Sequence, residues 1–104
     1  AFKIEKKEAR INWSDTRIDI ISKINALNPY PVAWFEYEGT RYKIWKATIS
    51  DLKGKPGEVL DESLIIGCQE KSIQILEIQK EGKKRMSVDD FLSGSKIPIG
   101  TIIS

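Results

Sequence analysis

Histidine is absent from the 104-residue sequence, and cysteine occurs once, at Cys68. Without histidine the chain lacks both the commonest metal ligand and the side chain that most often acts as a general base near neutral pH. A single cysteine excludes an internal disulfide and fits a reducing compartment, for which we expect the cytoplasm or an organelle matrix. A zinc site made from clustered Cys and His side chains is excluded by the same two counts.

Long apolar runs are also missing: no stretch of about 18 apolar residues is present, so the sequence predicts no membrane span. The opening residues, AFKIEKKEAR, lack the apolar segment of a secretory signal. They begin without methionine and are highly charged, which suggests a piece of a longer chain. We therefore expect residues 1–12 to be the remnant of an interdomain linker and residues 13–104 to form one small domain.

One helix is predicted near the start of this domain. After residue 16, apolar residues recur at a spacing of three (Ile18, Ile21, Ile24 and Leu27), and Ile20 widens this stripe, so one face of the helix is expected to be buried. Ser14 or Asp15 would cap the first turn, because their side-chain oxygens can accept a backbone N–H. The helix is expected to end at Asn28-Pro29, since the residue before a proline avoids helical backbone angles.

Short strands with turn residues between them are predicted over the rest of the chain, at residues 32–38, 41–50, 57–61, 64–69 and 72–79. Ser87 and Asp90 have the spacing of a capping box, which predicts a short helix with Val88, Phe91 and Leu92 buried. The tail 96–104 would form an edge strand. The pattern predicts a mainly β fold, an OB-like open barrel of five to six strands with an N-terminal helix and a short helix after strand five. Such barrels commonly bind oligonucleotides, although a fold alone does not establish function.

Catalytic interpretations find little support in the sequence. Asp89 and Asp90 could form an acid–base pair, but in the first turn of a helix they are better explained by the helix dipole. Cys68 lies in an apolar strand without a histidine to activate it, so we expect a core thiol. The carboxylates at 61–62 fit a turn, and the isolated glycines at 54, 57 and 67 make no phosphate loop. We predict that the chain has no catalytic, cofactor or metal site.

Two cationic stretches are the best candidates for binding. Residues 41–46 read RYKIWK and residues 80–85 read KEGKKR. The candidate phosphate-binding residues are Arg41, Lys43, Lys46, Lys83, Lys84 and Arg85. Strand alternation places Arg41, Lys43 and Trp45 on one face, with Lys46 on the other unless a bulge intervenes. If the two stretches are neighbours, they form one positive surface suited to phosphates.

A solvated sheet face is the alternative, and the charge pattern alone favours it. The three tryptophans also have an ordinary interpretation as core residues, which we prefer for Trp13 and Trp34. Whether Trp45 packs in the core or stacks on a nucleotide stays open.

The chain resembles a known family. Residues 10–39, RINWSDTRIDIISKINALNPYPVAWFEYEG, are similar to the opening of the C-terminal domain of methionyl-tRNA formyltransferases. The later strings YKIWKA, KPGEVL and LEIQKEGKKRMSVDDFL follow in the same order as in that domain, so the resemblance covers nearly the whole chain. Asn12 stands where the family usually has aspartate, and Tyr30 where tryptophan is more frequent.

The resemblance implies a function. In this family an upstream Rossmann-like domain, with catalytic Asn, His and Asp, transfers a formyl group from 10-formyltetrahydrofolate to methionyl-initiator-tRNA. The C-terminal barrel holds the tRNA by its phosphates. The expected partners are therefore initiator methionyl-tRNA and the N-terminal domain of the same chain, in a monomeric protein without membrane contact. The alternative is a scaffold module of a related sugar-nucleotide formyltransferase or formyltetrahydrofolate hydrolase, which would bind no nucleic acid.

Overall fold

The computed structural model describes residues 9–28, 32–94 and 97–103. These residues form two short helices, α1 (Arg17–Ala26) and α2 (Val88–Gly94). The strands are β1 (Trp34–Tyr37), β2 (Thr40–Ser50), β3 (Val59–Asp61), β4 (Ile65–Gly67), β5 (Ser72–Lys80) and β6 (Met86–Ser87). Within the described part of the chain, no helix is long and apolar enough to cross a membrane.

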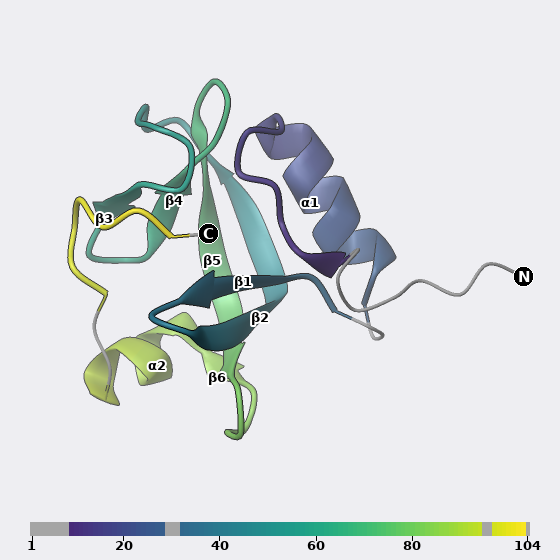
Figure 1. Cartoon of the computed structure of the whole chain (residues 1–104), viewed down its shortest axis with the longest axis vertical. Helices are drawn as coiled ribbons and strands as arrows, with labels where there is room; N and C mark the ends of the chain where they lie inside the picture. Colours follow the sequence, from purple (N-terminus) through teal and green to yellow (C-terminus); the bar gives the residue numbers. More distant parts are fainter. Residues whose placement is uncertain (1–8, 29–31, 95–96, 104) are drawn as a thin grey trace, which may run out of the picture.

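All strands belong to one antiparallel sheet in the order β1-β2-β5-β4-β3, with β6 paired to β5. In Figure 1 the sheet curls, α1 lies beside β2, and α2 lies at the lower end of the curl. The tail pairs with β3, since the Val59 N–H donates to the Thr101 carbonyl at 2.9 Å and the Ile103 N–H donates to the Gly57 carbonyl at 2.9 Å. The predicted mainly β, open-barrel architecture is confirmed. Lys96 and Ser104 of the predicted edge strand lie outside the described residues.

The long strands β2 and β5 form the centre of the sheet, and their pairing is irregular in the middle. The register shifts between Ile44 and Lys46 and again between Lys46 and Ala47. This is the bulge for which the predicted strand alternation allowed. The extra residue, Trp45, reverses which side chains of β2 face the core beyond this point. Tyr42 and Ile44 are buried on the core side, whereas Lys43 and Lys46 are both exposed.

The start of α1 differs from the prediction, because Thr16 is the capping residue instead of Ser14 or Asp15. The Thr16 hydroxyl accepts the N–H of Asp19 at 3.2 Å. Ser14 and Asp15 belong to the preceding turn. There the Ser14 N–H donates to the Asn12 side-chain oxygen and the Asp15 N–H donates to the Asn12 backbone carbonyl. The helix ends at Ala26 with Leu27 as its C-cap, and Pro29 lies outside the described residues.

The buried face of α1 was also predicted incorrectly at one position. Ile18 is 66% exposed, whereas Ile20, Ile24 and Leu27 are buried. A uniform spacing of three drifts around a helix that has about 3.6 residues per turn. The positions that stay on one face are therefore those spaced by four and then three, which leaves Ile18 on the solvent side.

An aromatic chain through the core joins both helical regions to the sheet. The Phe35 ring packs edge-on against Trp13 at 6.0 Å between centroids and stacks on Tyr42 at 5.2 Å. Tyr42 in turn meets the edge of Phe91 in α2 at 5.9 Å. Trp13 and Trp34 are each 5% exposed, so their predicted core positions are confirmed.

Residues 9–12 of the predicted linker already pack against this core. Ala9 is completely buried and Ile11 is 3% exposed. The Ile11 N–H donates to the Trp34 carbonyl at 2.8 Å, which places this segment beside the edge of β1. Residues 1–8 lie outside the described residues, so an interdomain role for them stays a prediction.

Asp51 ties three segments together at the end of the barrel opposite the β1–β2 turn. Its carboxylate accepts from Arg17 at the start of α1 at 3.0 Å and from Lys71, just before β5, at 3.4 Å. Arg17 also donates to the Ser50 carbonyl at 2.8 Å. The hydrogen bond from Arg17, and then the charge of Lys71, lower the pKa of Asp51 from its ordinary value of 3.8.

We expect Asp51→Asn to lower the melting temperature slightly at pH 7, because the lowered pKa means that the folded state favours the ionised carboxylate. This stabilisation is complete above the ordinary pKa of 3.8 and is lost as the pH falls through the lower folded-state value. The difference from the wild-type chain should therefore shrink below that pH. Thermal unfolding by circular dichroism between pH 2.5 and 7 measures it, with Glu62→Gln as a control at another exposed carboxylate. An equal melting temperature at pH 7 would contradict the expectation.

Candidate nucleic-acid interface

The two cationic stretches of the sequence are neighbours in the fold. The turn after β5 returns to the start of β2, where the Glu81 N–H donates to the Arg41 carbonyl at 2.9 Å. Lys43 lies directly opposite Gln79 across the β2–β5 ladder, and directly opposite residues share a face of the sheet. The two stretches are therefore neighbours, which is the condition stated above for a single positive surface.

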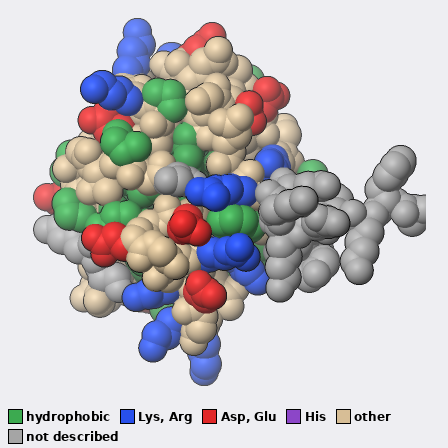
Figure 2. All heavy atoms as spheres, in the orientation of Figure 1, with side chains coloured by type: hydrophobic (Ala, Val, Ile, Leu, Met, Phe, Trp, Pro, Cys, Tyr) green, Lys and Arg blue, Asp and Glu red, His purple; other side chains and the backbone are tan. Residues whose placement is uncertain are grey.

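Four of the six predicted residues are exposed cations on these neighbouring elements. Lys43, Lys46, Lys83 and Lys84 are all exposed. Within residues 9–28, 32–94 and 97–103, none of these four ammonium groups has an ion pair within 4.0 Å. Figure 2 shows Lys and Arg side chains gathered around the turn between β5 and β6, with Asp and Glu side chains interspersed. We call Lys43, Lys46, Lys83 and Lys84 the lysine surface.

The two arginines of the prediction are engaged within the domain. The Arg41 guanidinium lies 4.3 Å from the centre of the Trp34 ring. The Arg85 guanidinium lies 4.7 Å from the Trp45 ring and donates to Glu77 at 2.8 Å. Each contact holds the planar guanidinium against the protein, so the arginines contribute structure as well as charge.

For Trp45 the sequence left two positions open, one in the core and one stacked on a nucleotide. The indole is partly buried and donates from Nε1 to the Gln79 side-chain oxygen at 3.0 Å. Arg85 occupies one face of the ring. Trp45 is therefore not a core residue like Trp13, and Arg85 leaves at most one face of its ring for stacking on a nucleotide base.

Arg10 is a further cation near this surface, outside the two cationic stretches of the sequence. Its guanidinium lies 5.3 Å from the Trp34 ring, and Arg10 forms a parallel bridge with Trp34 at the edge of β1. Trp34 is directly opposite Lys43 on the next strand. Arg10 was assigned to the linker because residues 1–12 show no periodicity, and only the tertiary fold places it beside β1.

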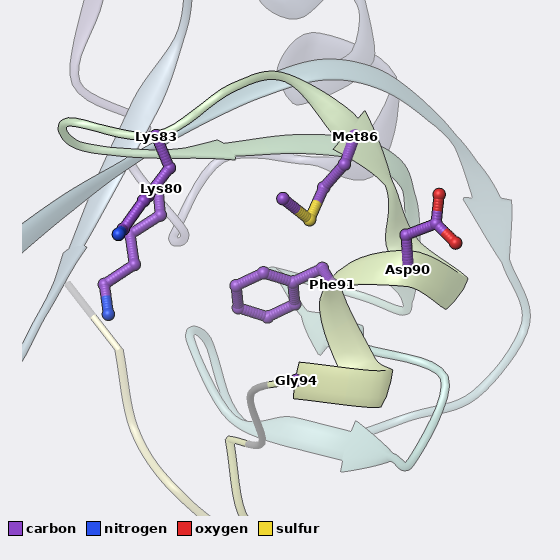
Figure 3. A pocket seen from close by; sticks show the side chains of 6 residues that line it. All are labelled: Lys80, Lys83, Met86, Asp90, Phe91 and Gly94. Atoms are coloured by element: carbon purple, nitrogen blue, oxygen red, sulfur yellow. The ribbon is translucent and has the colours of Figure 1, made fainter.

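A shallow pocket of about 220 Å³ lies between the turn after β5 and α2. Lys80 and Lys83 extend along one side of it, and Met86 and the Phe91 ring line the middle (Figure 3). Phe91 is only 4% exposed, which leaves little ring surface for a base to stack on. Lys80 lies opposite Tyr42 on the core-facing side of β5. The turn therefore carries a cation on that side of the sheet as well.

The residues weighed as catalytic have structural roles. Asp89 and Asp90 occupy the first turn of α2, where the Ser87 hydroxyl accepts the Asp90 N–H at 3.2 Å. Asp61 caps a turn by accepting the Ser63 N–H at 2.8 Å. Among the residues that the structure describes, no three His, Cys, Asp or Glu side chains are grouped so that they could hold a metal ion.

Cys68 is completely buried beside β4, and burial raises the pKa of its thiol. We expect no reaction with 5,5′-dithiobis(2-nitrobenzoate) in the folded chain at pH 8 and stoichiometric reaction in denaturing urea, because the thiolate is the reactive form. Absorbance of the released thiolate measures both, and the single cysteine makes the signal unambiguous. Fast labelling of the folded chain would contradict a core position.

Comparison with known proteins identifies relatives of the whole domain. The family model "Formyl transferase, C-terminal domain" matches residues 3–96. A methionyl-tRNA formyltransferase of Pelagibacter ubique is 46% identical over 105 residues, which covers 100% of this chain and 34% of the relative. One from Neisseria meningitidis serogroup C is 42% identical over 106 residues, covering 99% of this chain and 34% of the relative. The chain thus spans about a third of the length of these curated relatives.

Solved structures give the same fold. HypX from Aquifex aeolicus, crystallised with tetrahydrofolic acid, superimposes with a TM-score of 0.72 at 24% identity, covering 95% of this chain and 21% of that one. A HypX variant superimposes with a TM-score of 0.69 at 28% identity. With the family model matching most of the sequence, the resemblance seen in the sequence is confirmed: the chain belongs to the formyl transferase C-terminal domain family.

Proposed function

We propose that this domain holds the tRNA substrate of a methionyl-tRNA formyltransferase by its phosphates. The observation that carries the proposal is the lysine surface, in which two strand lysines and two turn lysines are exposed on adjoining elements and form no ion pair within the described part of the chain. Ammonium groups on such a surface suit a regular array of phosphates, because each contact releases a condensed counterion. Contacts of this kind position a nucleic acid without reading its sequence.

The relatives suggest how this domain works in a longer protein. Formyl transfer from 10-formyltetrahydrofolate would take place in an N-terminal domain of the same chain, while this domain supplies binding energy away from the reacting centre. No described residue provides a nucleophile–base pair, which fits a division of labour between the two domains. A monomeric, cytoplasmic protein with initiator methionyl-tRNA as its partner completes the proposal.

A scaffold role without nucleic acid is the second candidate, and specific contacts favour it. Arg41 and Arg85 are held by tryptophan rings, and Glu77 offsets the charge of Arg85. Glu36 lies opposite Arg41 on β1, and Glu81 accepts the Arg41 N–H at 3.3 Å. These carboxylates reduce the potential over part of the sheet face. The two candidates differ in whether the lysine surface contacts RNA.

Salt-dependent tRNA affinity distinguishes the candidates. We expect the 104-residue chain to bind initiator tRNA at low salt and Lys83→Ala/Lys84→Ala to bind more weakly. The slope of log affinity against log salt should fall by up to about two for the double variant, at roughly 0.9 per lost phosphate contact. Fluorescence anisotropy of labelled tRNA between 25 and 200 mM KCl measures the slope.

The matched control removes the same charge at the other end of the β2–β5 ladder. Lys53 and Lys55 are exposed in the loop after β2, near the Asp51 end of the barrel. Lys53→Ala/Lys55→Ala should leave the slope unchanged. Equal losses in both double variants would indicate attraction by net charge alone, and absence of binding by the wild-type chain at low salt would favour the scaffold role.

A further inference from the structure

One glutamine joins the cationic turn to the strand that carries the other two lysines. The Gln79 side-chain oxygen accepts the Trp45 Nε1–H at 3.0 Å. Its amide nitrogen donates to the backbone carbonyl of Lys83 at 2.9 Å. Because both ends of one planar amide are used, the backbone of Lys83 is held in place relative to the Trp45 indole on β2.

A second contact joins the same two elements from the far side of the turn. Arg85 lies over the Trp45 ring, and its Nε donates to Glu77 on β5. Trp45 therefore contacts the turn twice, through Gln79 and through Arg85. The bulge in β2 places Trp45 at this point, since the register shift falls between Ile44 and Lys46.

The turn needs such contacts because its backbone has few of its own. Gly82 has a φ of +80°, and nothing lies within 4 Å of where its Cβ would be. The Lys83 N–H closes the turn by donating to the Lys80 carbonyl at 2.9 Å. Apart from this bond, the described residues hold the tip through hydrogen bonds to Gln79 and Arg41, so loss of Gln79 would leave the carbonyl of Lys83 to solvent.

We propose that Gln79 and Trp45 are positioning residues, which hold the turn that carries Lys83 and Lys84 beside the strand that carries Lys43 and Lys46 for binding to a phosphate backbone. This inference rests on the proposed tRNA-binding function. Neither residue carries charge or needs to touch the nucleic acid. Their effect is to order the turn before binding, so that less conformational entropy is lost in the complex.

Charge-neutral substitutions separate positioning from contact. Gln79→Met keeps the size of the side chain but loses both hydrogen bonds. Trp45→Phe loses the indole N–H but retains a ring beneath Arg85. We expect Gln79→Met to weaken tRNA binding about three- to tenfold at fixed salt, and Trp45→Phe to weaken it less. Both should keep the wild-type salt slope, because no phosphate contact is removed. Gln74→Met, on the same strand, is the matched control and should bind like the wild type.

A second measurement reports the turn without RNA. In the free chain, ¹⁵N-¹H heteronuclear NOE values of Gly82, Lys83 and Lys84 should fall in Gln79→Met and stay unchanged in Gln74→Met. Melting temperatures identify any variant that has lost its fold. If Gln79→Met is such a variant, Trp45→Phe takes its place in the test.

The possible failures are distinguishable. If the wild-type chain binds tRNA but Gln79→Met binds equally well, or if its turn keeps its order, the positioning role is wrong and the proposed function stands. A reduced salt slope in Gln79→Met would mean that a phosphate contact has been lost, which also contradicts a purely positioning role. A wild-type chain without tRNA affinity overturns the proposed function and this inference together.

Discussion

The irregular pairing of β2 with β5 decides which side chains of these two strands enter the core and which face solvent. Regular alternation would direct every second side chain of β2 into the core, including one of its two lysines. The bulge at Trp45 avoids this, so that Tyr42 and Ile44 remain buried while Lys43 and Lys46 both face solvent. The same irregularity leaves Trp45 between the sheet and the turn after β5, where it contacts Arg85 and Gln79.

Rigid support for this surface comes from the core beneath it. Phe35 and Tyr42 stack in the centre, and both are nearly or completely buried. Truncation of a buried aromatic ring costs about 3–5 kcal/mol, a large part of the stability of a small domain. Trp13 near α1 and Phe91 in α2 extend this cluster to both sides of the barrel. The strand lysines thus lie on a sheet fixed by packing, whereas the turn that carries Lys83 and Lys84 is held by hydrogen bonds to Gln79 and Arg41.

The candidate site could be predicted only in part. The two cationic stretches and their six residues were visible as local patterns, and the family resemblance linked them to a nucleic acid. That Arg41 and Arg85 lie on tryptophan rings could not be predicted, because each contact joins residues brought together by strand pairing or by the turn. Arg10 was overlooked for the same reason: its neighbour Trp34 is on another strand. The roles of Gln79 and Glu77 likewise depend on which strand and face they share.

Composition, local order and family resemblance can be read from the sequence alone: no histidine, one cysteine, a mainly β pattern with two helices, and similarity to a known family. The composition and the pattern of elements follow from side-chain chemistry and from contacts within a few residues, and the family follows from similarity to known sequences. Where α1 begins, which of its isoleucines is exposed and where β2 bulges were decided by tertiary packing, because several local solutions are nearly equal in free energy until the core selects one. The same packing decided which cations remain free, since an ion pair or a cation–π contact exists only when distant segments meet.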